Sequence, residues 1–184
     1  MGFSCVTRSL YSILPLLLLL SITPLSSSFS PSEYVTKESL DALCSQPSIY
    51  KHFCVVWLGS DPKTFTLDIQ GLIGMATQKT EGLGDKNRGM LFDLGFTTHR
   101  PDIPYGPCVR KYDSSIQAIR KAEGFASSKD YVSAMKAAAT ALDNIAMCNA
   151  LLEQKPIPAY AASSNLMFER MCNILRVFTN ALIV

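Results

Sequence analysis

The sequence has little histidine, almost no net charge and no alternating strand pattern. It contains two histidines, His52 and His99, and 17 basic against 15 acidic side chains in 184 residues. The common catalytic motifs, namely H-E-x-x-H, G-x-S-x-G and a phosphate-binding glycine loop, do not occur. A nucleic-acid-binding domain needs a basic stripe on its surface. We therefore expect neither an enzyme nor a nucleic-acid-binding protein.

The segment CSQPSIYKHFC, residues 44–54, holds the most suggestive group of reactive side chains. A zinc site takes four ligands in close pairs, whereas Cys44, His52 and Cys54 supply three at unsuitable spacing. Residues i and i+2 of a helix point to different sides, so His52 cannot serve Cys54 as a base. We expect no metal, no cofactor and no catalytic residue here, and we interpret the cysteines as structural.

The first 30 residues have the pattern of a cleaved signal peptide. One basic residue, Arg8, precedes an apolar run from Leu10 to Ile22, and serines follow. A membrane anchor needs about 20 apolar residues, and Pro15 interrupts this shorter run. We expect cleavage after Ser28 or Ser30 and a secreted, monomeric domain of residues 31–184 that is not bound to a membrane. Without Arg8 its net charge is about +1.

Cysteine is the residue type that organises the remaining chain. Cys5 leaves with the leader, and five cysteines stay, namely Cys44, Cys54, Cys108, Cys148 and Cys172. Secretion places them in an oxidising compartment, where disulfides form. Because five is odd, at least one thiol is free or pairs with another chain. Four cysteines allow three pairings, and the residues alone leave that choice open.

The periodicity of apolar residues is helical nearly throughout and predicts an all-α fold. Tyr50–Leu58 is expected to form a short helix with Pro47 in its first turn, and a longer helix is expected from Phe65 to Leu83, capped by Ser60 or Asp61. Residues 82–107 contain five glycines and three prolines, and we expect irregular structure there.

The spacing of apolar residues in the second half of the chain predicts three more helices. One runs from Cys108 to Gly124, and the next starts at Lys129, capped by Ser127 or Ser128. The latter has a bundle-type seam, formed by Tyr131, Ala134, Ala138, Ala141, Ile145, Cys148 and Leu152. The last helix begins near Ala159, with Met167, Met171, Ile174, Phe178 and Ala181 on its inner face. The economical fold is an up-and-down bundle of four long helices preceded by a short helical segment.

The spacing of the cysteines, with one pair ten residues apart and one forty apart, resembles that of the plant invertase and pectin methylesterase inhibitor family. Tyr112 and the stretch SSKDYVSA at a helix joint fit the same family, over residues 38–182. The stretch LGSDPKTFTLDIQGL, residues 58–72, is similar to the branch that includes plane-pollen allergens of the invertase-inhibitor type.

The resemblance implies an N-terminal helical hairpin closed by Cys44–Cys54, a bundle with the disulfide Cys108–Cys148, and an unpaired Cys172. It also implies a secreted inhibitor of a carbohydrate-active enzyme, acting in the cell wall or, alternatively, the vacuole. Invertase-directed relatives carry Pro-Lys-Phe at the joint where this chain has Lys129, Asp130 and Tyr131, which we take as candidate partner-binding residues. Pectin methylesterase is therefore the first candidate target, acid invertase the second, and a storage or ligand-binding bundle the remaining alternative.

Overall fold

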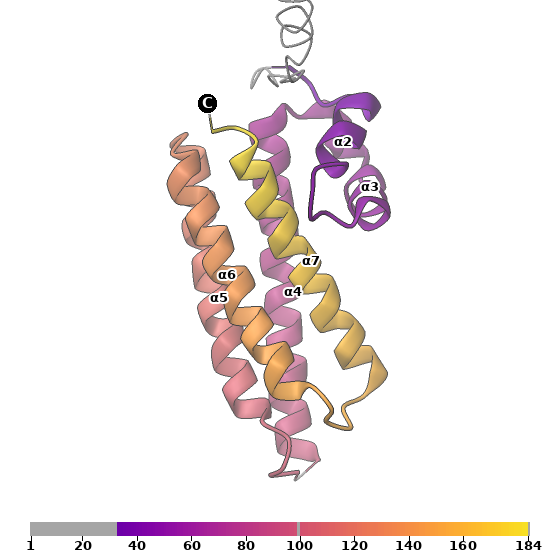
Figure 1. The fold of residues 1–184 in the computed structure, drawn as a ribbon, viewed down its shortest axis with the longest axis vertical. Coiled ribbons are helices and arrows are strands. Elements are labelled where there is room, and N and C mark those ends of the chain that lie inside the picture. The colour runs from indigo at the N-terminus through magenta and orange to yellow at the C-terminus, as the bar shows by residue number, and fades with distance from the viewer. Residues whose placement is uncertain (1–32, 99, 184) are drawn as a thin grey trace, which may run out of the picture.

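Four long helices form an antiparallel bundle in the computed structural model, which describes residues 33–98 and 100–183 (Figure 1). They are α4 (Ile69–Thr97), α5 (Tyr105–Ser127), α6 (Tyr131–Leu152) and α7 (Ala159–Asn180), and each packs against the next, with α7 returning to α4. The predicted all-α bundle is confirmed. The expected leader, residues 1–30 with Cys5, lies outside the described residues. Among the described helices, none has the length and apolar character needed to cross a membrane.

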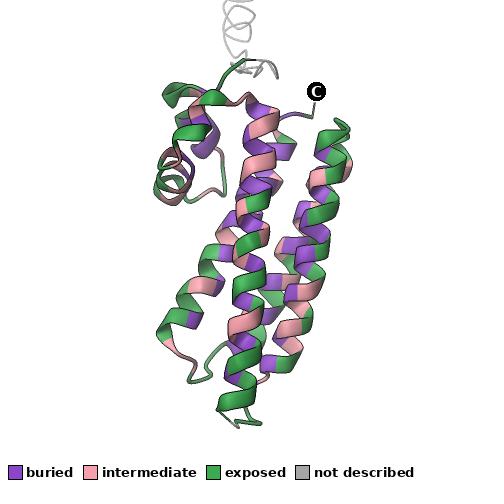
Figure 2. Ribbon diagram, turned by 180° about the vertical axis from the view of Figure 1, so that it is seen from behind, coloured by how far each residue is buried: buried purple, intermediate pink, exposed green. Residues whose placement is uncertain are grey.

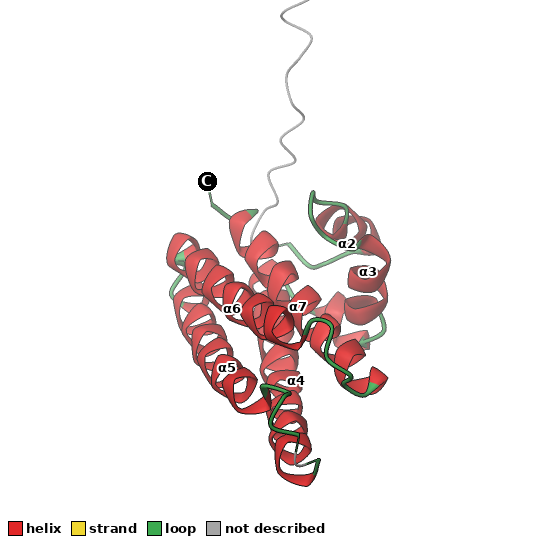
Figure 3. Ribbon diagram, turned by 60° about the horizontal axis from the view of Figure 1, so that its bottom comes forward, coloured by secondary structure: helices red, strands yellow, loops and turns green. Residues whose placement is uncertain are grey.

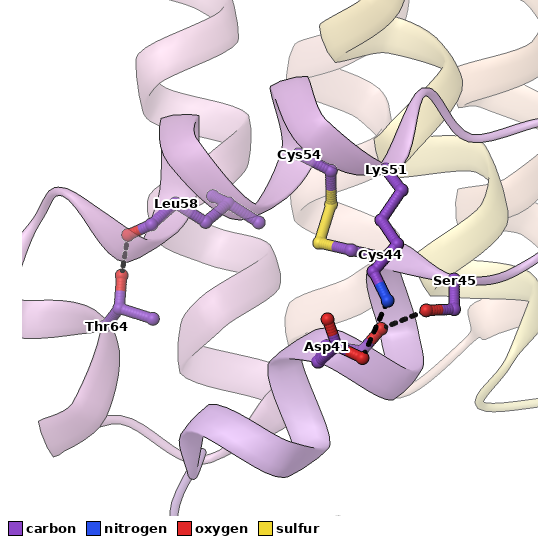
Figure 4. Close-up of a disulfide and its surroundings, with 7 residues drawn as sticks. All are labelled: Asp41, Cys44, Ser45, Lys51, Cys54, Leu58 and Thr64. Carbon is purple, nitrogen blue, oxygen red and sulfur yellow. Dashed lines mark hydrogen bonds and ion pairs between the residues drawn. A yellow bond between two sulfur atoms is a disulfide. The ribbon is translucent and has the colours of Figure 1, made fainter.

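A helical hairpin precedes the bundle and lies beside the first half of α4 and the second half of α7 (Figure 1). It consists of α2 (Lys37–Cys44) and α3 (Lys51–Gly59). Thr36 caps α2 by accepting a hydrogen bond from the backbone N–H of Ser39. The disulfide Cys44–Cys54 joins the two helices (Figure 4). Pro47 lies in the turn between them, because α3 begins only at Lys51, and the expected place of Pro47 in the first turn of α3 is wrong.

The hairpin is held on α7 by polar and aromatic contacts. The Asn173 side chain donates a hydrogen bond to the backbone oxygen of Ser48 over 2.6 Å. The Arg170 guanidinium lies 4.2 Å from the centre of the Tyr50 ring, a cation–π contact. The turn and α3 therefore have a fixed position on the bundle that does not depend on the disulfide alone.

A short 3-10 helix, η1 (Pro62–Thr66), connects the hairpin to α4. Asp61 caps η1, as the sequence suggested, but α4 starts later, with Asp68 accepting a hydrogen bond from the backbone N–H of Gly71 over 2.7 Å. The expected single helix from Phe65 is thus two elements. Each begins at an aspartate, which satisfies backbone N–H groups that have no partner within the helix.

The expectation of irregular structure over residues 82–107 is wrong for residues 82–97 and 105–107, because α4 continues to Thr97 and α5 starts at Tyr105; residues 98 and 100–104 lie outside the helices. The inward positions of α4 follow the bundle spacing, but several are not hydrophobic. Thr80, Gly84 and Asn87 are buried between Ala76 and Leu91. A search for apolar periodicity therefore loses the helical pattern at these positions, although the helix continues through them.

Gly84 is required where α4 passes close to its neighbours. A Cβ atom at this position would lie 2.8 Å from Cε2 of Phe168 on α7 and 2.9 Å from Cγ1 of Ile116 on α5. Gly82 and Gly89, in contrast, face open space. Glycine inside a helix costs roughly 1 kcal/mol of stability relative to alanine. At Gly84 the close packing of α4 against α5 and α7 compensates for this cost.

Buried residues gather on the sides of the helices that face one another (Figure 2), and they are mostly small on α6 and larger on α7. The predicted α6 seam is confirmed, since Ala134, Ala138, Ala141, Ile145, Cys148 and Leu152 are all buried, whereas Tyr131 is half-buried. On α7, Met171, Ile174 and Phe178 are buried as expected. Met167 is 40% exposed, and Phe168 takes the inward position beside it.

A second disulfide, Cys108–Cys148, links α5 to α6, and Cys172 is a buried free cysteine on α7. Burial raises the pKa of the Cys172 thiol, which keeps it protonated and unreactive. Near it, the Tyr112 hydroxyl donates a hydrogen bond to Asn165 over 2.7 Å and accepts one from Asn87 over 3.1 Å. This network connects α4, α5 and α7, and the Asn87 side chain also donates to the backbone oxygen of Ser164 and accepts from its hydroxyl.

Candidate functional site

The joint between α5 and α6, the first candidate site, is a tight helix-to-helix turn. Lys129 adopts a left-handed backbone conformation, with φ at 62°. Its N–H donates to the Ala126 oxygen over 3.0 Å, and the N–H of Asp130 donates to the Phe125 oxygen over 2.9 Å. This pair of bonds is the Schellman arrangement that ends many helices. Glycine usually occupies the left-handed position, because a Cβ there is strained.

Asp130 begins α6 as its N-cap residue, not as a residue of the first turn. Its carboxylate accepts a hydrogen bond from the backbone N–H of Ser133 over 3.0 Å. Hydrogen bonding from Ser133 lowers the pKa of Asp130 below its ordinary value, and the positive end of the helix dipole favours the same charge. The expectations of a helix start at Lys129 and a cap from Ser127 or Ser128 are therefore wrong. Asp130 has a structural reason to be acidic.

Tyr131 packs against the core with its ring, while Lys129 and Asp130 are exposed. The hydroxyl oxygen of Tyr131 is buried and has no hydrogen-bond partner. The Gln70 side chain donates to the Ser127 oxygen over 3.4 Å, which ties the joint to the first turn of α4. The three candidate residues are thus adjacent, but they present one cation and one anion to solvent, with the aromatic ring turned inward.

The exposed sides of α6 and α7 form a surface that is poor in charge. Charged side chains number two in the 22 residues of α6, Lys136 and Asp143, against six each in α4 and α5. On α7, Arg170 and Arg176 contact the hairpin, and Glu169 accepts a hydrogen bond from Asn149. Little charge would therefore have to be desolvated if another protein covered this side.

A shallow groove of about 420 Å³ runs along this surface, between the end of α6 and the start of α7. Its lining is mostly apolar, and Leu166 in it is 44% exposed, but it includes one charged side chain, Glu153. The other residues are Asn149, Ala150, Leu152, Ile157, Ala162 and Asn165. We call it the α6–α7 groove. Contact surfaces between proteins are depleted in charged residues at their centre. Sequence reasoning missed this groove, although the scarcity of charge over residues 131–152 pointed to it.

No group of three or more potential metal ligands occurs in the described part of the chain, residues 33–98 and 100–183. His52 is exposed on α3, between Tyr50 and Phe53, the two residues whose rings Arg170 contacts, and His99 lies outside the described residues. Cys44 and Cys54 are joined to each other and fully buried. The segment that looked like a reactive site is a cross-link between two helices (Figure 4).

The fold and these surfaces define a small disulfide-linked helical binding protein. The sequence model of the family described as "Plant invertase/pectin methylesterase inhibitor" matches residues 38–182, and the chain belongs to this family. Its members are protein inhibitors rather than enzymes, and they are generally extracellular.

Two relatives from plane trees are similar in sequence. A "Putative invertase inhibitor" of Platanus acerifolia is 27% identical over 139 residues, which cover 74% of this chain and 78% of the relative. A protein of the same description from Platanus orientalis is also 27% identical, over 74% of this chain and 82% of the relative. The expected resemblance to the plane-tree branch is confirmed.

Two crystal structures of Arabidopsis pectin methylesterase inhibitors have the same fold. A mutant form superimposes with a TM-score of 0.67 at 19% identity, covering 78% of this chain and 95% of that one. The other has a TM-score of 0.61 at 18% identity, covering 82% and 99%. At these identities the likeness concerns the fold.

Proposed function

We propose that this chain is a secreted inhibitor that acts on pectin methylesterase of the plant cell wall. Family membership supports the inhibitory role, and the geometry of the α5–α6 joint favours this target over invertase. The choice of target rests on Asp130, whose exposed carboxylate is held at the start of α6 by a hydrogen bond from the backbone N–H of Ser133.

An acidic residue at the joint is unfavourable in the sugar pocket of a glycosidase. Such pockets generally contain two catalytic carboxyl groups, and the invertase-directed relatives insert a lysine there. Replacement of that lysine by Asp130 turns an attraction into a repulsion, and like charges placed together across an interface cost several kcal/mol.

The backbone conformation of the joint also favours pectin methylesterase over invertase as the target. Invertase-directed relatives have proline at the position of Lys129. Proline fixes φ near −65° and has no N–H, whereas Lys129 has φ at 62° and donates to Ala126. The joint would have to change its conformation, and not only its side chains, to match those relatives.

The stretch of residues 58–72, which by its sequence resembles the plane-tree branch, has a structural role. Asp61 and Asp68 cap η1 and α4, and the buried Thr64 hydroxyl donates to the Leu58 oxygen (Figure 4). These residues connect the hairpin to the bundle, so their presence does not favour one target enzyme.

The ligand-binding alternative receives little support from the bundle interior. Ala134, Ala138 and Ala141 are completely buried where α6 packs on α5. Small residues in such a seam bring two helices close together and leave no room for a ligand between them.

Inhibition assays test the proposal. Residues 31–184, with both disulfides formed, are mixed with a cell-wall pectin methylesterase and, separately, with acid invertase. We expect micromolar inhibitor to abolish the esterase activity at a stoichiometric ratio and to leave invertase unchanged. Inhibition of invertase alone, or of neither enzyme, would show that the proposed target is wrong.

We place the contact with the enzyme on the α6–α7 groove. Leu166→Asp introduces a charge into its exposed apolar lining, and we expect it to weaken inhibition at least about tenfold, or about 1.4 kcal/mol. Gln117→Asp is the matched control, because it adds the same charge to an exposed position of α5. Equal inhibition by both variants would exclude the groove as the contact.

A further inference from the structure

The two aromatic side chains with the highest exposed fractions in the described part of the bundle lie together at the end of α4, far from the α5–α6 joint. Phe92 is 63% exposed and Phe96 is 74% exposed. They are four residues apart, so their rings project from the same side of the helix. Exposed apolar residues are ordinary when scattered singly, but these two line one groove with α5, a groove of about 440 Å³.

The floor of this groove is open because two of its residues are glycines. Gly95 on α4 would place a Cβ 3.1 Å from the Cβ of Tyr105, so the helices approach closely there. Gly106 contributes no side chain on α5, and Tyr105 and Val109 complete the apolar surface. We call it the Phe92–Phe96 groove. Figure 3 shows this end of α4 and the loop after it, turned toward the viewer.

Arg110 is the one charged residue among the described residues that line the groove. The acid one turn further along α5, Asp113, is bound to Arg88 over 3.1 Å. Arg110 itself forms no salt bridge within the described residues, and its side chain is near Gly106. An uncompensated guanidinium at the edge of an aromatic groove favours an anionic ligand, and its planar fork can bind a carboxylate through two hydrogen bonds.

We infer that the Phe92–Phe96 groove binds a uronate unit of an acidic polysaccharide. The negative face of a phenyl ring attracts the weakly positive C–H groups of a pyranose, and Phe92 and Phe96 offer two such faces. Arg110 pairs with the carboxylate. A volume of about 440 Å³ suits a small number of sugar units and lies within the range of small-molecule sites.

The surroundings of the groove favour a sugar over a protein partner. Arg88–Asp113 lies one turn away on both helices, and Arg100–Asp102, at 2.9 Å, lies in the loop before α5. A stable protein interface buries more than about 1,000 Å² in total and would have to desolvate these ion pairs, which is costly. A sugar chain in the groove leaves them in water.

Calorimetric titration of the whole secreted domain with three oligosaccharides tests this inference. The ligands are a de-esterified oligogalacturonate, the same oligomer with every carboxyl methylated, and a neutral oligosaccharide of equal length. We expect the de-esterified oligomer to bind at least about tenfold tighter than the methylated and the neutral ones, and to bind more weakly as salt is added. Sulfate at equal ionic strength is the control for a non-specific anion.

Single substitutions then locate the site. Arg110→Gln and Phe96→Ala are each expected to weaken binding at least about tenfold, or about 1.4 kcal/mol. Lys121→Gln removes the same charge from an exposed position further along α5 and is expected to have less than about twofold effect. All three substitutions are at exposed positions, and circular dichroism establishes that each variant is folded.

The inference is overturned if acid and ester bind equally, if sulfate competes as well as the oligomer, or if Lys121→Gln acts like Arg110→Gln. A fourth result would also overturn it, namely that the oligomer does not bind while Phe96→Ala weakens enzyme inhibition. The groove would then be a contact for the enzyme. No enzyme is present in the titrations, so their outcome is independent of the proposed function.

Discussion

At the residue scale, the buried hydroxyl groups of two tyrosines differ in their hydrogen bonding. The Tyr112 hydroxyl has two hydrogen-bond partners in the core, whereas that of Tyr131 is buried without one. Tyr112→Phe should lower the free energy of unfolding by about 1–3 kcal/mol, because Asn87 and Asn165 lose a partner. Tyr131→Phe should leave it unchanged or raise it slightly. Urea unfolding of the two variants checks this, and equal losses would contradict it.

Asp130 gives the start of α6 a dependence on pH. Because hydrogen bonding from Ser133 lowers its folded-state pKa, the stabilisation is complete above the unfolded pKa of about 3.9. It is lost as pH falls through the folded value. In Asp130→Asn the side chain still caps the helix but does not titrate. We expect this variant to lose less stability than the parent between pH 5 and 2, measured by thermal unfolding, and parallel curves would contradict the prediction.

At the scale of single elements, the glycines of α4 should respond in opposite ways to alanine. Gly84→Ala places a methyl group against Phe168 and Ile116 and should cost about 1–3 kcal/mol. Gly82→Ala and Gly89→Ala meet open space, and each should stabilise the protein by about 0.5–1 kcal/mol. Urea unfolding measures all three, and stabilisation by Gly84→Ala would show that α4 does not pack as closely as described.

Two substitutions of Lys129, in the joint between α5 and α6, should change the stability of the protein in opposite directions. Lys129→Gly relieves the left-handed strain and should raise the free energy of unfolding by up to about 1 kcal/mol. Lys129→Pro loses both the backbone angle and the hydrogen bond to Ala126, and should lower it by more than about 1 kcal/mol. A stable proline variant would contradict the turn geometry and would remove one reason to disfavour invertase.

The same elements explain what sequence reasoning found and what it missed. The α6 seam was predictable because each inward residue is apolar or a small alanine. The second half of α4 was not, since Gly84 and Asn87 take inward positions for reasons located on other helices, namely the Phe168 ring and the Tyr112 hydroxyl. The cap at Asp130 was displaced because a left-handed lysine at 129 has no signature in the sequence.

The whole molecule is cross-linked in two places that stabilise different parts. By the chain-entropy model, loss of Cys44–Cys54 should cost about 3 kcal/mol and loss of Cys108–Cys148 about 4 kcal/mol. Replacement of each pair by alanine, followed by thermal unfolding, measures both. We expect the first variant to keep the bundle helices and the second to melt as a whole. Loss of bundle helicity in the first would show that the hairpin is required for the bundle.

The length of α4 has a thermodynamic consequence. Its 29 residues span about 43 Å, with the α5–α6 joint tied to its first turn through Gln70 and the Phe92–Phe96 groove at its last turns. Sites separated by such a distance, without shared partners, usually contribute additively to stability. A change at Lys129 and one at Phe96 should therefore combine within about 0.5 kcal/mol of their sum. A destabilising substitution at one end of the molecule then needs no compensating substitution at the other end.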